Sequence, residues 1–491
     1  MKAKARLFKE KEGGKVKKFD YDLVVIGSGA AGGTAAMMAA GAGLKTALVE
    51  AGTWGGTNIN RRDIPYAAAS HFSQTFFGAI EASKFGLSST TLKYNYPSVL
   101  NWNLVAQKRA GANSKKEFED AGVTCLEGFA QFISPNEVSV GENGNITAKK
   151  FIIATGAAPI DPGITGSTEA ECLLPEDVFT LRRIPKVVMV VGGGATGCEV
   201  AEYLAEMGSK VLLAEISERL LPKEDPEAGE VIETRFTKTL GIKVLTSSRV
   251  VATEKAGKET LPNGRKTDVT KVQFMRGGQE KSVKVEAVIL CTGSEPAVDL
   301  GLSNAEVKFS SQGIQVNAMM QTSAKHIYAC GDVADVKLEK HADAAELSST
   351  EKASYEAAIA ASNIVSRAKG TVNYRGFVRM TDTFPKVAAV GLTEDECIAR
   401  DLRYKQVLVP LSSVSASNTS EYQDGFVKIV SNREQKILGA TIVAPNADLL
   451  IQEIVLAMKA DLKLVDLATT PHVALSFGEA VRVAARRATK A

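Results

Sequence analysis

The chain has 491 residues, of which 45% are hydrophobic and 23% charged, and its formal net charge is +3. This length is enough for about three domains of ordinary size, and the composition is typical of a globular protein. So small a net charge argues against a nucleic-acid or membrane partner. The six cysteines are scattered and the four histidines lie far apart, which predicts neither a disulfide framework nor a local metal motif. Scattered thiols and the lack of an apolar leader favour a cytoplasmic protein.

Residues 1–19 form a lysine-rich segment. A solvated, disordered arm is the simpler interpretation of such a segment. The alternative is electrostatic contact with an acidic partner or a lipid surface.

The stretch from Asp22 to Glu50 reads as a buried strand, a glycine turn, a helix and a second strand. Gly27, Gly29 and Gly32 fit the G-x-G-x-x-G pattern, in which a helix N-terminus faces a pyrophosphate. Glu50 ends the second strand, where a carboxylate can accept hydrogen bonds from ribose hydroxyls. The same uncharged stretch is long enough to span a bilayer, but its glycines and embedded strand argue against a membrane helix.

Residues 187–215 repeat this pattern. Gly192, Gly194 and Gly197 take the three glycine positions, and Glu215 ends the second strand at the same distance from the first glycine. Two independent matches of this kind predict two dinucleotide units on one chain.

Each unit is followed by an apolar strand that runs into a Thr-Gly turn. The first copy contains Thr155 and Gly156, and the second contains Gly293. Asp332 follows a further strand and a glycine, where it can accept a hydrogen bond from a polyol hydroxyl. We expect Asp332 to open a helical stretch.

Two dinucleotide units imply two dinucleotides. A redox enzyme needs an electron relay between hydride donor and acceptor, so one group is expected to be a tightly held flavin and the other a nicotinamide. Glu215 would repel a 2′-phosphate and so favours NAD(H), with NADP(H) as the alternative because Arg219 could offset that repulsion.

From about residue 372 the pattern changes to strand-like runs followed by a helix near residues 448–459. This predicts a separate α+β domain without phosphate-binding loops. The fold class is therefore α/β, with two Rossmann-like dinucleotide-binding domains and a C-terminal α+β domain, for which one expected role is dimerisation.

The motifs GSGAAGG, GGTNINRRDIP, ATGAAP, GGGATGCEVA, CTGSEP, IYACGDV and LATTPHVALSFGEA resemble the pyridine nucleotide–disulfide oxidoreductases, the group of dihydrolipoamide dehydrogenase and mercuric reductase. The resemblance implies FAD bound by residues 20–158 and 288–366, NAD(P)H bound by residues 159–287, and a homodimer formed through residues 370–491. The implied cofactor contacts are Gly27, Gly29, Gly32, Glu50, Gly56, Thr57, Thr155, Gly156 and Asp332, together with Gly192, Gly194, Gly197, Glu215 and Gly293.

Two departures from the family pattern concern the redox centre. The family sequence GGTCxNxGCIPSK reads GGTNINRRDIPYA here, so Asn58 and Asp63 stand at the two cysteine positions. Near the C-terminus His472 fits the first histidine of the H-x-H-P pair and Glu479 fits the following glutamate, but Ala474 stands at the catalytic histidine. Thiol chemistry needs a thiolate, a resolving partner and a base, so dithiol or disulfide reduction is not expected.

The four candidate catalytic residues are therefore Asp63, Asn58, His472 and Glu479. Asp63 either exchanges a proton during electron transfer or is a helix-start carboxylate paired with Arg61 or Arg62. Those arginines either hold an anionic acceptor or form salt bridges. Asn58 either contacts an acceptor carbonyl or caps a helix. His472 either supplies an acid to the partner subunit's site or is structural.

The sequence thus predicts an FAD-dependent NAD(P)H oxidoreductase that passes electrons to a small acceptor: a quinone, another electron carrier or O2. One alternative is a soluble pyridine nucleotide transhydrogenase. Another is a flavin-binding scaffold or redox sensor without turnover.

Overall fold

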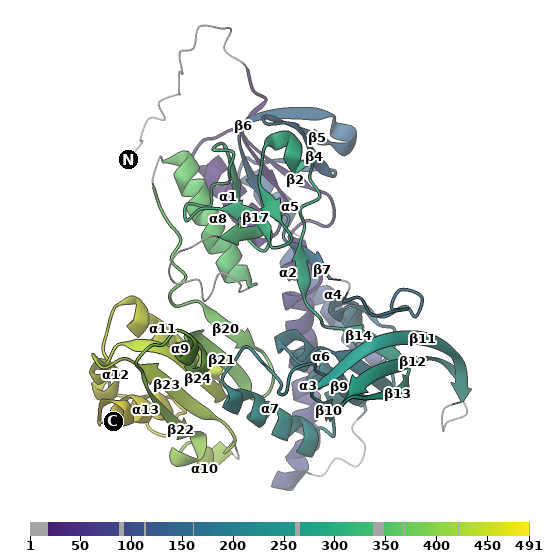
Figure 1. Cartoon of the computed structure of the whole chain (residues 1–491), viewed down its shortest axis with the longest axis vertical. Helices are drawn as coiled ribbons and strands as arrows, with labels where there is room; N and C mark the ends of the chain where they lie inside the picture. Colours follow the sequence, from purple (N-terminus) through teal and green to yellow (C-terminus); the bar gives the residue numbers. More distant parts are fainter. Residues whose placement is uncertain are drawn as a thin grey trace. The chain divides into compact units, whose positions relative to one another are not determined.

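The computed structural model describes residues 18–87, 93–111, 114–160, 162–260, 266–336, 348–366, 369–420 and 422–490, so nearly all of the basic segment lies outside the described residues. The chain divides into two compact units (Figure 1). The first comprises Met1–Pro65, Leu104–Ile160 and Ser294–Asn373. The second comprises Tyr66–Asn103, Asp161–Gly293 and Tyr374–Ala491. The domain bounds given above remain a prediction.

The first unit is built on a sheet whose central strands are parallel, in the order β3-β2-β1-β6, with β18 pairing β6. The bounds are β1 Tyr21–Ile26, β2 Thr46–Glu50, β3 Thr124–Glu127, β6 Asn145–Ile153 and β18 Ile327–Ala329. β5 (Glu137–Val140) pairs antiparallel with β6, and β4 (Ala130–Ser134) pairs antiparallel with β5. Strand β1 is apolar and its last four residues are buried, as the sequence predicts for a central parallel strand.

Helix α1 (Ala30–Gly41) connects β1 to β2 and packs against α8 (Thr350–Val365) (Figure 1). The smaller elements of this unit are α5 Ser114–Asp120, β7 Ala157–Pro159, β15 Ser294–Pro296, β16 Phe309–Ser310, β17 Gly313–Val316 and β19 Ala334–Val336. The expectation that Asp332 opens a helical stretch is wrong, because β19 follows it and pairs with β17.

The sequence predicts one helix that begins near Asn58 and continues through Ala67–Ala69, but the structure has two helices here. Helix α2 (Gly56–Asn60) ends before Arg61, and α3 (Asp63–Glu81) begins two residues later. Proline cannot donate the backbone hydrogen bond of a helix interior but is tolerated in the first turn. Pro65 therefore sits in the first turn of a new helix rather than within a continuous one.

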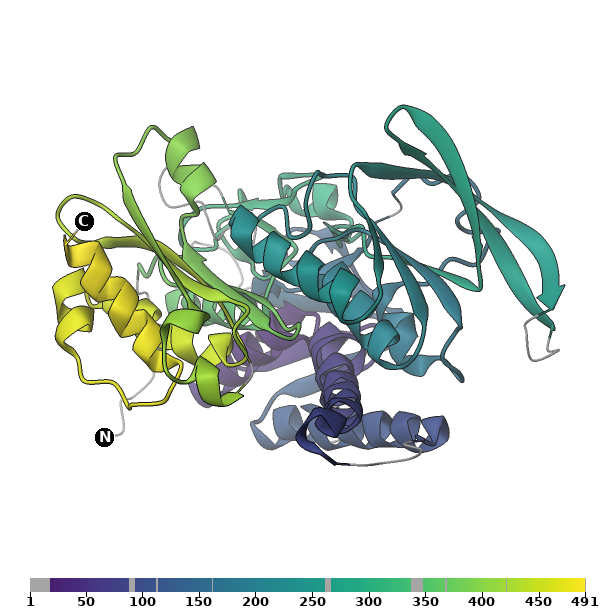
Figure 2. The ribbon, with the colours of Figure 1, turned by 90° about the horizontal axis from the view of Figure 1, so that it is seen from below.

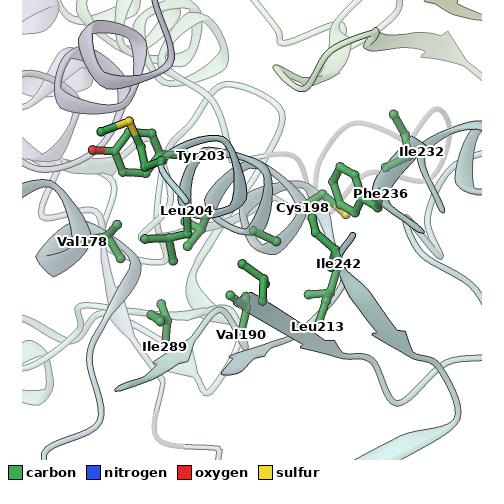
Figure 3. Close-up of a cluster of buried hydrophobic side chains, with 14 of the residues drawn as sticks. Val178, Val190, Cys198, Tyr203, Leu204, Leu213, Ile232, Phe236, Ile242 and Ile289 are labelled. Atoms are coloured by element: carbon green, nitrogen blue, oxygen red, sulfur yellow. The ribbon is translucent and has the colours of Figure 1, made fainter. Parts of the chain in front are cut away.

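The second unit repeats the parallel arrangement in the order β10-β9-β8-β14. The bounds are β8 Val187–Val191, β9 Lys210–Ala214, β10 Lys243–Leu245 and β14 Ala287–Leu290, with α6 Ala195–Glu206 after β8 and α7 Pro226–Lys238 after β9. An antiparallel sheet of β11 Ser248–Thr260, β12 Lys266–Arg276 and β13 Gln279–Val285 follows. Figure 3 shows the core between α6, α7 and the strands, with Cys198 among the apolar side chains. Helix α4 runs over Tyr96–Gly111.

The C-terminal sheet is antiparallel, in the order β20-β21-β24-β23-β22. Its strands are β20 Val378–Thr381, β21 Lys386–Gly391, β22 Lys405–Pro410, β23 Phe426–Ser431 and β24 Ile437–Ala444, and its helices are α9 Glu394–Ala399, α10 Ser417–Ser420, α11 Ala447–Lys459, α12 Leu464–Thr469 and α13 Gly478–Lys490. Figure 2 shows the yellow C-terminal helices against the strands. Along β24, Ile442 packs on the cluster that contains those helices, whereas Val443 joins the core of Figure 3. The sheet is therefore buried on both faces.

Among the described residues, no helix combines the length and the apolar character needed to cross a membrane.

Candidate functional site

The first and third glycines of each G-x-G-x-x-G turn are required by the backbone itself. Gly27 has φ +97°, and a Cβ there would lie 2.4 Å from the carbonyl oxygen of Ala154. A Cβ on Gly32 would lie 1.7 Å from the carbonyl oxygen of Gly27. Real Cβ atoms do not approach that closely, so these two positions exclude side chains.

The second turn repeats this geometry. Gly192 has φ +105°, and its Cβ would lie 2.3 Å from the carbonyl oxygen of Cys291. A Cβ on Gly197 would lie 1.8 Å from the carbonyl oxygen of Gly192. The repeat predicted from sequence is therefore a repeat in three dimensions.

The middle glycines, Gly29 and Gly194, are different. Their φ values of −65° and −73° suit any residue. A Cβ on Gly29 would be 3.8 Å from Cα of Gly56, and one on Gly194 would meet no described atom within 4 Å. Helices α1 and α6, which begin at the next residues, have no side-chain cap. Both turns thus leave open space beside uncapped backbone N–H groups, which is the arrangement that binds phosphate.

The acids at the two strand ends are held in the same way. Glu50 accepts hydrogen bonds from the backbone N of Ser28 (2.9 Å) and of Gly52 (2.7 Å). Glu215 accepts from the backbone N of Gly193 (2.5 Å) and of Ser217 (2.7 Å). Each carboxylate is thereby fixed beside its glycine turn, where a ribose hydroxyl could reach it.

Arg219, which could have favoured a 2′-phosphate, is engaged elsewhere. Its Nη2 donates to Oδ2 of Asp395 (3.0 Å) and to the carbonyl oxygens of Pro222 (3.2 Å) and Glu224 (3.4 Å). The guanidinium of Arg219 is therefore paired with Asp395 at the start of α9.

The remaining predicted cofactor residues of the first unit lie on turns. The hydroxyl of Thr155 donates to the carbonyl oxygen of Ala297 (2.8 Å), and Gly156 has φ +71°. Asp332 accepts a hydrogen bond from Oγ of Ser348 (2.6 Å). Thr57 and Gly56 open α2, and a Cβ on Gly56 would lie 2.5 Å from Cα of Gly29, so glycine is required there. In the second unit, Gly293 has φ +104°.

Asn58 and Asp63 are joined by a third residue that the sequence did not single out. Nδ2 of Asn58 donates to Oγ1 of Thr350 (2.5 Å), and Oγ1 of Thr350 donates to Oδ2 of Asp63 (2.9 Å). Asn58 is the third residue of α2, so the capping alternative is wrong; the cap position is Gly55. Asp63 is the first residue of α3 and is exposed. Arg61 and Arg62 are exposed as well.

All six cysteines are free thiols. Burial raises the pKa of the Cys198 and Cys330 thiols well above the usual range, and it raises the pKa of Cys397 to about 11. Burial also raises the pKa of Cys125 and Cys172. These five thiols are therefore protonated at neutral pH, whereas a redox thiol must ionise.

The imidazole ring of His472, in the C-terminal domain, lies between two hydrogen-bond acceptors. Nδ1 is 2.9 Å from the carbonyl oxygen of Thr470, and Nε2 is 3.0 Å from Oε2 of Glu453. Burial raises the pKa of Glu453, although His472 opposes that rise. Glu479, in the first turn of α13, accepts from the backbone N of Leu475 (3.3 Å). The glutamate that contacts His472 is thus Glu453, which the sequence did not suggest.

Comparison with known proteins assigns the fold and both dinucleotide units. The family model described as pyridine nucleotide-disulphide oxidoreductase matches residues 21–360, and the model of its dimerisation domain matches residues 378–485. The chain belongs to the pyridine nucleotide-disulphide oxidoreductase family. Members of this family are oxidoreductases that bind FAD and NAD(P)H. The resemblance stated from the sequence motifs is therefore confirmed.

Curated relatives of this oxidoreductase match along nearly the whole chain. A mercuric reductase of Staphylococcus aureus is 31% identical over 478 residues, covering 95% of this chain and 82% of the relative. A dihydrolipoyl dehydrogenase of Thermus scotoductus is 33% identical over 473 residues, covering 93% and 95%. Crystallographic LpdA of Mycobacterium tuberculosis shares the fold, with a TM-score of 0.81 at 23% identity over 95% of this chain and 99% of that one.

The residues of this oxidoreductase fit the two cofactors of its family. The open space beside Gly29 and Gly194 is unexplained by the protein's own packing, and each opening has a fixed carboxylate at the neighbouring strand end. These are the requirements of two adenine dinucleotides.

Proposed function

We propose that this family member is an FAD-dependent NADH oxidoreductase that delivers electrons directly to a small acceptor and uses no redox disulfide. When bound, FAD supplies a group that takes up a hydride equivalent and releases two electrons. The acceptor class is a quinone, another small electron carrier or O2. One observation carries the proposal. Asn58 and Asp63 stand at the two cysteine positions of the family pattern, and hydrogen bonds join both of them to Thr350.

The first glycine turn would hold FAD and the second the nicotinamide coenzyme. Gly29 and the N-terminus of α1 would receive the FAD pyrophosphate, and Glu50 its adenosine ribose. Gly194 and Glu215 would do the same for NADH. Asp332 would orient the polyol chain of FAD, and its Ser348 contact fixes one carboxylate oxygen.

NADH is preferred over NADPH in this proposal. Glu215 is buried and already bonded to two backbone N–H groups, so it cannot turn away from a 2′-phosphate without breaking both bonds. Arg219 forms a hydrogen bond with Asp395 and would therefore not offset the negative charge of Glu215. The same two facts count against transhydrogenation, which needs both coenzymes.

In this proposal Asn58 and Asp63 act where the family pattern has its two redox thiols. Asp63 would exchange a proton as electrons leave for the acceptor, and Asn58 would present its amide beside it. The exposed Arg61 and Arg62 would attract an anionic acceptor.

The active protein would be a homodimer formed through the dimerisation domain. His472 and Glu479 would then approach the partner subunit's flavin site, as the resemblance implies. Because Ala474 stands at the catalytic histidine position, His472 and Glu479 would hold the acceptor rather than activate a thiol.

The deciding experiment is an anaerobic titration of the purified holoprotein with NADH. A flavin alone takes up two electrons per subunit, whereas a flavin and a disulfide take up four. We expect one NADH to complete the reduction. Uptake of a second equivalent, with the appearance of two new titratable thiols, would refute the absence of a disulfide. No bleaching by NADH at all would favour the scaffold alternative.

Acceptors would be compared by stopped-flow reoxidation with quinones, dyes, O2 and NADP+ analogues. Variants D63A and N58A should keep the NADH half-reaction and slow reoxidation. Unchanged acceptor turnover in both variants would remove these two residues from the chemistry.

A further inference from the structure

We propose that Thr350 is a positioning residue that holds Asn58 and Asp63 as one hydrogen-bonded unit and so sets the rate of electron delivery to the acceptor. This inference rests on the proposed function. It adds a residue that neither the sequence motifs nor the family resemblance singles out.

The direction of the two hydrogen bonds follows from the chemistry of a hydroxyl. Thr350 has one proton, and its Oγ1 gives that proton to Oδ2 of Asp63 (2.9 Å). It must therefore accept from its other neighbour, Nδ2 of Asn58 (2.5 Å). This fixes the orientation of the Asn58 amide, with its NH2 toward Thr350 and its carbonyl oxygen on the opposite side.

Asp63 needs such a partner in order to have a defined position. It is the exposed first residue of α3, and an exposed side chain exchanges rotamers within nanoseconds. A hydrogen bond to a carboxylate is stronger than one between neutral groups, so the Thr350 contact selects one carboxylate geometry. Productive proton transfer requires that kind of fixed geometry.

The hydroxyl of Thr350 is not the N-terminal cap of its own helix, α8. The cap of α8 is Ser349, whose Oγ accepts from the backbone N of Lys352 (3.2 Å). Thr350 is the next residue, and its hydroxyl forms hydrogen bonds with Asn58 of α2 and Asp63 of α3, which are far away in the sequence. A purely local role in helix α8 does not explain either bond.

Thr350 is also attached to a rigid frame. Its side chain is β-branched and therefore has few rotamers. Helix α8 packs against α1, and its fully buried Glu356 accepts a hydrogen bond from the backbone N of Gly331 (2.7 Å), one residue before Asp332. The hydroxyl is thus fixed relative to the first glycine turn and to Asp332, both parts of the proposed FAD site.

The test uses T350V, which keeps the shape and removes the hydroxyl, and T350S, which keeps the hydroxyl. Thr237→Val is the matched control, because that exposed threonine bonds only to carbonyl oxygens of its own helix in the described structure. NADH reduction and acceptor reoxidation are measured separately on FAD-loaded protein. The double variant T350V/D63A, compared with T350V and D63A alone, completes a double-mutant cycle.

We expect T350V to slow reoxidation about tenfold, the usual effect of losing one hydrogen bond to a charged group, and to leave NADH reduction and the acceptor KM unchanged. T350S should recover to within about threefold of the parent, and T350V/D63A should be no slower than D63A, because residues of one unit are not additive. Thr237→Val should behave as the parent.

Three results would overturn the inference: parent-like reoxidation in T350V, no recovery in T350S, or additive effects of T350V and D63A. If D63A slows reoxidation and T350V does not, Thr350 is wrongly assigned while the proposed function stands. If neither variant affects reoxidation, both the inference and the proposed role of Asp63 fail.

Discussion

Replacing Lys428 with methionine should strongly destabilise the second unit. The Lys428 side chain is 1% exposed, and its Nζ lies 3.1 Å from Oδ1 of Asp225, 2.9 Å from Oε1 of Glu227 and 2.9 Å from Oε2 of Glu394. Lys428 lies on β23, Asp225 and Glu227 at the start of α7, and Glu394 at the start of α9. One ammonium group is therefore shared by three carboxylates from two helix starts.

The size of the effect follows from the burial of Asp225, whose side chain is 2% exposed. Removing one partner of a buried ion pair leaves an uncompensated charge and costs about 3–5 kcal/mol. Asp225 keeps its bond from Oγ1 of Thr441, and Glu227 and Glu394 are 35% and 26% exposed, so water can solvate those two. We expect about 3 kcal/mol of lost stability, near the low end of that range.

The stability lost on replacing Lys428 with methionine should not depend on pH between 6 and 9. Burial lowers the pKa of Lys428, but hydrogen bonds to Glu394, Glu227 and Asp225 outweigh burial and raise it above its ordinary value. A group whose pKa is raised on folding gives its full stabilisation below its unfolded pKa, about 10.4 for lysine. The stabilisation would be lost only as the pH rises through the folded pKa.

Thermal unfolding of K428M and of K436M at pH 6 and 9 would check this expectation. Lys436 is a suitable control because its side chain is 47% exposed and lies 3.8 Å from Asp461, a surface pair that contributes about 0–1 kcal/mol. We expect the melting temperature of K428M to fall by roughly 6–10 °C. A K428M melting temperature equal to that of K436M would refute the argument.

Three further expectations can be checked directly. Gly197→Ala should abolish NADH binding by fluorescence titration while the protein stays yellow, because its Cβ would overlap the carbonyl oxygen of Gly192; retained binding contradicts the turn geometry. Iodoacetamide at pH 8 should not modify Cys198 or Cys330 in the folded, NADH-reduced protein, since burial raises their pKa and keeps them protonated; mass spectrometry would reveal the modification that contradicts this. Asp395→Ala should lower the KM for NADPH several-fold, because Arg219 would be released, and leave the KM for NADH unchanged; an unaltered preference would show that Arg219 does not matter.

The sequence predicted the fold well because its signals are local. Each glycine turn, its preceding strand and its terminal acid lie within 30 residues, and their spacing alone specifies strand, turn, helix and strand.

The contacts that the sequence did not predict join residues far apart in the chain. Asn58 and Thr350 are separated by 292 positions, and Arg219 and Asp395 by 176. Neither pair has a local pattern, because a hydrogen bond between distant segments depends on how the strands and helices are assembled. The break between α2 and α3 has a different cause: the sequence pattern predicts one continuous helix, whereas Pro65 lies in the first turn of a second helix.

The paired backbone contacts of Glu50 and Glu215 bear on how readily each nucleotide half could be recognised. Both carboxylates are immobilised by the chain's own amides before any ligand arrives, so almost no rotamer freedom remains to be lost on association. A truncated ligand such as ADP-ribose, which lacks the nicotinamide ring, would then retain much of the coenzyme's affinity. The adenosine end would act as an anchor, leaving the reactive end free to enter and depart.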